Sequence, residues 1–198
     1  IKNSRKYRGQ RVVIGSVTDG YLPQEEQFRN TRKLLKQLRG SEAEILICTK
    51  SDLVVRDLDL LKQLGKVTVS WSINTLDEAF HQDMDKAVSI ERRLAAMKAV
   101  YEAGIRTVCF IAPVFPGITD FTAIFHRVKD QCDLVWLENL NLRTSTPIWF
   151  PCIGPSTKRG TGAIFNSWKN RRPSWRQKTT APLWTTNCLT VGLSRAIP

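Results

Sequence analysis

Apolar runs alternate with amphipathic stretches over the first 143 residues of the chain. Strands are predicted at residues 11–14, 44–48, 67–73, 106–112 and 134–137. Helices are predicted between them, at residues 24–39, 57–64, 89–103 and 120–131. Near-continuous apolar strands separated by helices are typical of a parallel sheet with covered faces. The pattern therefore predicts an α/β fold, either an open sheet or a barrel.

The same pattern places three polar residues. Asp57 stands at the start of the second predicted helix and is expected to cap its N-terminus. His81 is expected in a polar loop after the third strand, and His126 on the helix at residues 120–131. Neither histidine is expected to be a metal ligand, so the sequence predicts no metal site.

The balance of acidic and basic residues changes at the point where the alternation of apolar runs and amphipathic stretches ends. The whole chain of 198 residues has a formal net charge of +12. Residues 1–143 contain 22 of the 30 Lys and Arg residues and all 18 Asp and Glu residues, a balance of +4. Residues 144–198 contain the other eight basic residues, no acidic residue and four of the six tryptophans. We therefore expect a patterned core at residues 1–143 and an irregular, basic, Trp-rich tail at residues 144–198.

This tail allows three interpretations. Basic residues interleaved with aromatic ones can bind single-stranded nucleic acid by stacking and by phosphate contacts. The segment can equally be a natural tail with little order, or the product of a reading frame that shifts after Arg143. The alternative function is therefore a basic nucleic-acid-binding protein that acts through the Trp/Arg-rich tail.

The cysteines lie far apart in the sequence, and they are Cys48, Cys109, Cys132, Cys152 and Cys188. Their spacing excludes a local C-x-x-C zinc or redox site. An odd number of cysteines, with no signal-like apolar stretch after the basic N-terminal residues, indicates reduced intracellular thiols. No apolar run approaches the ~20 residues of a membrane-spanning helix. We therefore expect a cytoplasmic protein with no membrane partner.

Candidate site residues follow the predicted strands, because the carboxyl ends of parallel strands meet at one edge of a sheet. They are Ser16, Thr18 and Asp19, then Cys48 and Lys50, then Ser72 and Asn74, then Ala112 and Pro113, and finally Glu138 and Asn139. This edge suits a ligand with both an ammonium, taken by Thr18 and Asp19, and a carboxylate, taken by Lys50. The alternative is that hydroxyl residues simply end the strands and that Asp19-Gly20 is a turn.

Five segments carry a resemblance to a known family, and they are GSVTDGYLPQEEQFRNTRKLL, ILICTKSDLVVRDLDLL, VSWSINTLDE, ERRLAAMKAVYEAGIRTVCFIAPVFPGITD and VWLENLNLR. In this order, from about Val12 to Arg143, they resemble the radical S-adenosylmethionine (radical SAM) enzymes of the spore photoproduct lyase-like group. The resemblance implies a partial (β/α)6 TIM-like barrel that holds S-adenosylmethionine and a [4Fe–4S] cluster. It implies reductive cleavage of this cofactor to a 5′-deoxyadenosyl radical, which abstracts hydrogen from a substrate.

The resemblance assigns roles at the first two strand ends. Thr18, with Ser16 and Asp19 nearby, corresponds to the segment that binds the methionyl ammonium. Lys50 corresponds to the lysine that faces the methionyl carboxylate.

Further along the chain, Ser72 and Asn74 fall where the family contacts the carboxylate and the ribose. The backbone around Ala112 and Pro113 is expected to lie against the adenine. The residues expected nearest the substrate are Cys48, Glu138 and Asn139.

Two departures from the family limit what the resemblance implies. The C-x3-C-x2-C loop that ligates the cluster does not occur in this sequence. We therefore expect this chain to lack the first β/α unit and the cluster ligands, and to be inactive alone. Ser16 stands where the photoproduct-repairing lyase has a hydrogen-donating cysteine, so we expect an unidentified substrate, together with an electron donor for the cluster.

Overall fold

The computed structural model describes residues 4–115, 118–139 and 188–192. The strands are β1 (Arg11–Ile14), β2 (Glu44–Thr49), β3 (Lys66–Ser72), β4 (Arg106–Val114), β5 (Leu134–Asn139) and β6 (Cys188–Gly192). The helices are η1 (Ser4–Tyr7), α1 (Glu25–Phe28), α2 (Asn30–Leu38), η2 (Leu53–Asp57), α3 (Leu58–Leu61), α4 (Glu78–Met84), α5 (Ile90–Glu102) and α6 (Phe121–Val128). The predicted alternation of strands and helices is confirmed from β1 to β5.

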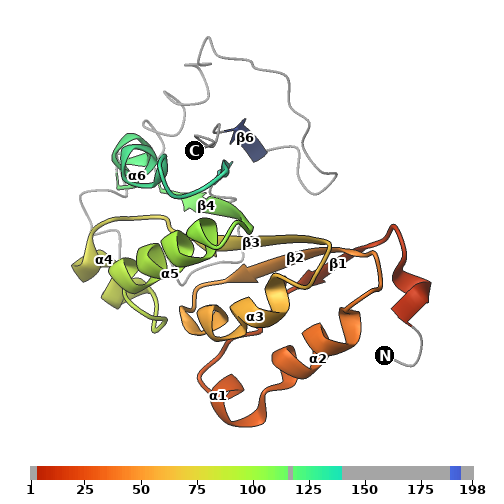
Figure 1. The fold of residues 1–198 in the computed structure, drawn as a ribbon. Coiled ribbons are helices and arrows are strands. Elements are labelled where there is room, and N and C mark those ends of the chain that lie inside the picture. Colours follow the sequence, from red (N-terminus) through yellow and green to blue (C-terminus); the bar gives the residue numbers. More distant parts are fainter. Residues whose placement is uncertain (1–3, 116–117, 140–187, 193–198) are drawn as a thin grey trace, which may run out of the picture.

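The strands form one sheet in chain order, from β1 to β6. Strands β1 to β5 are parallel, and β6 pairs antiparallel with β5. Right-handed crossovers between neighbouring parallel strands return on the same side of a sheet, and α2, α3 and α5 lie together on one face (Figure 1). This arrangement is the wall of a β/α barrel, so the predicted partial barrel is confirmed. The carboxyl ends of β1 to β5 meet at one edge.

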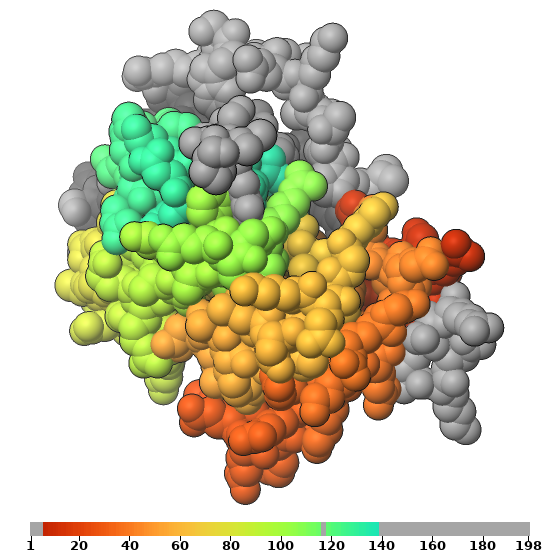
Figure 2. Space-filling view, viewed as in Figure 1, coloured from red at the N-terminus to blue at the C-terminus, as the bar shows by residue number. Residues whose placement is uncertain are grey.

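The core lies between the sheet and these helices. Burial alternates along β2, where Ile45 and Ile47 are buried and Leu46 is only half-buried. Leu94 and Met97 of α5 belong to the same core cluster. The side chains of α2, α3 and α5 form a continuous layer over the face of the sheet that these helices cover (Figure 2). Burial of one such side chain stabilises the fold by about 1.5–3 kcal/mol.

Side chains cap the N-terminal ends of several described helices, α5 and α6 among them. The Ser89 hydroxyl accepts a hydrogen bond from the Arg92 backbone N–H at the start of α5. The Asp120 carboxylate accepts one from the Ala123 N–H at the start of α6. Such caps satisfy backbone donors that have no partner within the helix.

The helix predicted at residues 24–39 is instead two helices, α1 and α2. The break falls at Arg29, whose φ of 52° is left-handed. Glu25 stabilises the break, because its buried carboxylate accepts a hydrogen bond from the Arg32 backbone N–H in the first turn of α2.

Two predicted placements of polar residues are wrong. Asp57 makes no side-chain cap bond to α3, because its carboxylate is occupied by two arginines and a tyrosine. His81 lies on α4 and is buried, not in a polar loop. His126 is on α6, as predicted.

Strand β6 lies in the segment predicted to be irregular. Its five residues pair with the edge of β5, with Thr190 opposite Trp136. One short strand gives no strand–helix alternation in sequence, so the pattern did not reveal it. The predicted boundary after Arg143 lies outside the described residues, and the division into core and tail stays a prediction. Within the described ranges, no helix is long and apolar enough to cross a membrane.

Candidate functional site

A cavity of about 1010 Å³ opens at the carboxyl ends of β1, β2 and β3. Its wall includes Asp19 after β1, Cys48 and Lys50 at the end of β2, and Ser72 at the end of β3. Residues 85–88, in the loop between α4 and α5, complete it. The structure therefore brings four of the predicted site residues to one cavity.

Gly15 brings the ends of β1 and β2 together. Its φ is +89°, and a Cβ at this position would lie 2.1 Å from the Cys48 carbonyl oxygen. Glycine alone combines this backbone conformation with so close an approach. The contact sets the spacing of the two strand ends that form the cavity.

Asp19 joins the same two strand ends through its carboxylate. It accepts hydrogen bonds from the Tyr21 N–H at 2.9 Å, the Thr49 hydroxyl at 2.9 Å and the Lys50 N–H at 2.7 Å. All three donors are neutral, so the charge of Asp19 is not paired by them. Asp19 therefore orders the turn and the backbone of Lys50, while its predicted contact with a ligand ammonium stays a prediction.

Lys50 forms an ion pair with Asp85 on the cavity wall, with 2.6 Å between Nζ and Oδ2. Burial raises the pKa of Asp85, but the hydrogen bond and charge of Lys50 outweigh burial and hold the pKa below its usual range. Asp85 is therefore ionised at neutral pH. An ammonium has three N–H donors and Asp85 takes one, so Lys50, whose side chain is 46% exposed, can also bind a ligand carboxylate.

Arg93 of α5 lies buried behind this ion pair. Its guanidinium donates to the carbonyl oxygens of Ser72 and Val88, each at 3.0 Å. Its Nη2 is 3.6 Å from Asp85 Oδ2 and 3.3 Å from His81 Nε2. One buried cation therefore connects the end of β3 to the loop that completes the cavity.

The sequence prediction missed both Arg93 and Asp85. A signal for Arg93 exists, because Ile90, Arg93, Leu94 and Met97 have the spacing of one helix face. An arginine among three buried apolar residues needs buried polar partners. Asp85 carries no such signal, since it lies in a loop whose position depends on the packing of α4 and α5.

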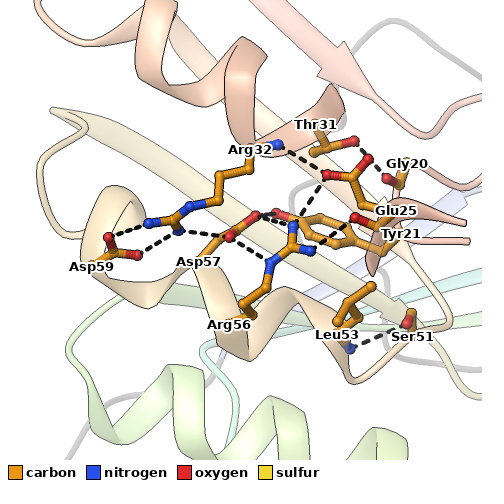
Figure 3. Close-up of polar contacts among 10 residues, drawn as sticks. All are labelled: Gly20, Tyr21, Glu25, Thr31, Arg32, Ser51, Leu53, Arg56, Asp57 and Asp59. Atoms are coloured by element: carbon orange, nitrogen blue, oxygen red, sulfur yellow. Dashed lines mark hydrogen bonds and ion pairs between the residues drawn. The ribbon is translucent and has the colours of Figure 1, made fainter. Parts of the chain in front are cut away.

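A second polar cluster, also missed, lies between the turn after β1 and η2 (Figure 3), and its members Tyr21 and Arg56 also line the cavity. The buried Asp57 carboxylate accepts hydrogen bonds from Arg32, from Arg56 and from the Tyr21 hydroxyl. Glu25 binds the other side of Arg56 at 3.1 Å. Burial and the charge of Asp57 raise the pKa of Tyr21, so this tyrosine stays a hydrogen-bond donor. The cluster connects the turn after β1 to η2.

Several predicted site residues do not line this cavity. Ser16 and Thr18 are exposed in the turn after β1. The Asn74 carbonyl accepts a hydrogen bond from the Thr119 hydroxyl at 2.8 Å. Ala112 and Pro113 lie within β4, where the register with β5 shifts between Ile111 and Val114; Pro113, which has no N–H, suits such an irregularity. Glu138 is on β5 outside the cavity wall, and the side chain of Asn139 is outside the described residues.

The described cysteines are spread over the fold. Cys48 is half-buried on the cavity wall, where burial and the charge of Asp19 raise the pKa of its thiol. Cys109 is buried in β4, and burial raises the pKa of buried Cys132 to about 12. Among the described residues, no three His, Cys, Asp or Glu side chains are grouped to hold a metal ion. This donor set does not fit a [4Fe–4S] cluster, which needs grouped thiolates.

A parallel sheet in chain order, with helices on one face and a polar cavity at its carboxyl edge, defines a barrel-type α/β domain. The family described as the Radical SAM superfamily matches residues 1–125. The chain belongs to the radical SAM superfamily.

The curated proteins that are similar to this chain include the following two. The uncharacterised protein MJ0683 of Methanocaldococcus jannaschii is 37% identical over 146 residues, which cover 73% of this chain and 55% of that protein. The uncharacterised protein ORF301 of Acidianus two-tailed virus is 33% identical over 136 residues, 68% of this chain and 43% of that protein. The chain spans about half the length of the curated relatives it matches.

The solved structures that share the fold include the following two. A spore photoproduct lyase mutant with bound AdoMet and dinucleoside spore photoproduct gives a TM-score of 0.53 at 19% identity, covering 63% of this chain and 37% of that one. Streptococcus suis SuiB bound to S-adenosylmethionine gives 0.52 at 12% identity, covering 83% and 45%. Both likenesses concern the fold alone.

S-adenosylmethionine, which the superfamily implies, fits the cavity by its chemistry. The ligand carries a carboxylate, an ammonium and a sulfonium. The cavity wall presents four cations, Lys50, Arg56, Lys86 and Arg92, and four carboxylates, Asp19, Glu26, Asp52 and Asp85. The donors and acceptors of this wall therefore match the charged groups of the cofactor.

Proposed function

We propose that the cavity at the ends of β1, β2 and β3 binds S-adenosylmethionine as part of a radical SAM enzyme. The observation that carries the proposal is a lysine–aspartate ion pair on the wall of a cavity of about 1010 Å³, in a chain of this superfamily. Bound beside a reduced [4Fe–4S] cluster, this cofactor supplies hydrogen-abstraction chemistry. In this proposal the described residues bind the cofactor, and no group of cluster ligands is found among them.

Three residues of the cavity wall, Lys50, Asp19 and Ser72, contribute to ligand binding in this proposal. Lys50 binds the carboxylate of the ligand, and Asp19 positions Lys50 through the bond to its backbone N–H. Ser72 offers a hydroxyl from the end of β3. Thr18, Ser16 and Asn74 remain candidates for contacts with the ligand from outside the described cavity wall, and Ala112 and Pro113 remain candidates for the adenine.

The residues proposed to contact the substrate lie on the cavity wall and on β5. Cys48 lies on the cavity wall with a thiol that stays protonated at neutral pH, because burial raises its pKa. Cys48, Glu138 and Asn139 are the candidates for substrate contact. The proposal also includes an electron donor and a cytoplasmic location, which the cysteine count favours.

Isothermal titration of the full chain with S-adenosylmethionine tests the proposal. Lys50→Met removes one charge-assisted contact at a half-exposed position, which costs about 1.0–1.4 kcal/mol, or five- to tenfold in Kd. Lys66→Met is the matched control, because Lys66 begins β3 at the opposite edge of the sheet. Absence of binding, or an equal effect of the two substitutions, would overturn the assignment.

Nucleic-acid binding through residues 144–198 is the alternative function. Residues 140–187 and 193–198 lie outside the described structure, so this alternative rests on the Trp- and Arg-rich composition. It predicts an affinity for single-stranded DNA that falls steeply with salt and is lost on deletion of the segment.

A further inference from the structure

Arg93 lies behind the cavity wall, where it contacts two separate parts of that wall. Its side chain is only 2% exposed. Its Nη1 donates to the carbonyl oxygen of Ser72 at the end of β3, and its Nε donates to the carbonyl oxygen of Val88. Its Nη2 lies 3.6 Å from Asp85 Oδ2. A guanidinium is a rigid plane of N–H donors, so Arg93 fixes the loop at residues 85–88 relative to the end of β3.

The position of this loop determines where Lys50 is held. Asp85 Oδ1 accepts a hydrogen bond from the Ala87 backbone N–H at 3.1 Å, and Asp85 Oδ2 accepts one from Lys50 Nζ at 2.6 Å. A lysine side chain that is 46% exposed has many rotamers open to it. Because Asp85 is fixed by its own loop and by Arg93, it restricts Lys50 to one place on the cavity wall.

The fold of α5 does not by itself require an arginine at this position. Ile90, Leu94 and Met97 share the buried face of α5 with Arg93, and an apolar residue there would not have a charge to bury. The polar contacts of Arg93 are made with the cavity wall, at the end of β3 and in the loop at residues 85–88.

We propose that Arg93 is a positioning residue of the ligand site, which acts through Asp85 to hold Lys50 where it meets the ligand carboxylate. This inference rests on the proposed function. It assigns no contact between Arg93 and the ligand. An effect of Arg93 on binding must therefore depend on Lys50 and on the carboxylate of the ligand.

The test compares two ligands by titration calorimetry on the full chain. S-adenosylmethionine has an amino-acid part with the carboxylate, whereas 5′-methylthioadenosine has the same adenosine and no amino-acid part. Arg93→Lys keeps the positive charge and loses the planar group that contacts three partners. We expect it to weaken S-adenosylmethionine about three- to fivefold, which is less than the loss expected for Lys50→Met, and to leave 5′-methylthioadenosine unchanged. A merely structural role of Arg93 would weaken both ligands equally and would overturn the inference.

A double-mutant cycle tests the dependence on Lys50. In a Lys50→Met background we expect Arg93→Lys to have no further effect on the affinity for S-adenosylmethionine. The same fold-loss in both backgrounds would show that Arg93 does not act through Lys50. Lys98→Met is the control, because Lys98 is an exposed residue of α5 that pairs with Glu102, and it leaves both affinities unchanged.

A second variant keeps the inference testable if Arg93→Lys does not fold. Asp85→Glu keeps the charge in a partly exposed loop but moves the carboxylate by one methylene, so it cannot keep its contacts with Lys50, Ala87 and Arg93 together. We expect a selective loss for S-adenosylmethionine of about two- to threefold. If wild-type protein binds S-adenosylmethionine and the folded variants change neither affinity, the inference alone fails. If wild-type protein does not bind S-adenosylmethionine, the proposed function fails, and the inference fails with it.

Discussion

Replacement of Asp57 by asparagine perturbs the most completely buried carboxylate of the second polar cluster, which contains Tyr21, Glu25, Arg32, Arg56 and Asp57. Asp57 has a side-chain exposure of 0% and accepts four hydrogen bonds, one from Tyr21, one from Arg32 and two from Arg56. Asparagine keeps the size but removes the charge and part of the acceptor capacity. Two arginines then lose their shared partner.

The size of the expected loss of stability depends on the ion pairs that Arg32 and Arg56 keep in the variant. Breaking a buried ion pair costs about 3–5 kcal/mol. Arg32 keeps Asp59 at 2.7 Å and Arg56 keeps Glu25 at 3.1 Å, and both arginine side chains are about a fifth exposed. We therefore expect Asp57→Asn to lower the free energy of unfolding by about 2–3 kcal/mol, which is less than the full cost of a broken buried ion pair.

Urea unfolding followed by circular dichroism measures this loss. Asp59→Asn is the matched control, because Asp59 pairs with the same Arg32 but is exposed, and surface ion pairs contribute little. We expect the control to lose much less stability than Asp57→Asn. Equal losses in the two variants would show that burial is not the reason why the Asp57 ion pairs stabilise the fold.

Two further predictions concern the cavity. Gly15→Ala forces a Cβ against the Cys48 carbonyl oxygen at 2.1 Å, so we expect the free energy of unfolding, measured in urea, to fall by about 2–4 kcal/mol. The control is Gly104→Ala, at a φ of +81° with nothing within 4 Å of the added Cβ, which we expect to lower the free energy of unfolding by only about 1 kcal/mol. Equal losses in the two variants would exclude the close contact as the cause. The pKa of Asp85 is depressed in the folded state, so its ion pair stabilises the protein above the ordinary carboxyl pKa of about 4, and this stabilisation is lost as the pH falls through the folded pKa. We therefore expect wild type to be more stable than Asp85→Asn at pH 6 and the difference to disappear by pH 2. A stability difference that does not change with pH would contradict the ionised state of Asp85.

The sequence predicted the fold well because the signals for it are local. Each strand is an apolar run, and Ser89 and Asp120 mark helix starts by side chains that bond to their own helices. The site was predicted only in part. Asp19, Lys50 and Ser72 follow strands whose carboxyl ends must meet, so topology alone brings them together.

The residues that the prediction missed depend on packing between segments distant in sequence. Asp57 stands at the start of a predicted helix, which favoured a capping role, but helix α2 brings Arg32 to it and the turn after β1 brings Tyr21. Asp85 reaches Lys50 only because α4 and α5 place their connecting loop beside the end of β2. Neither contact has a signature in the local pattern.

A crystal structure of the chain with S-adenosylmethionine tests the central claim most directly. The account predicts that the ligand occupies the cavity at the ends of β1, β2 and β3, with its carboxylate within hydrogen-bond distance of Lys50 Nζ. A ligand bound at another place on the protein, or an empty cavity at a saturating concentration of the ligand, would contradict it.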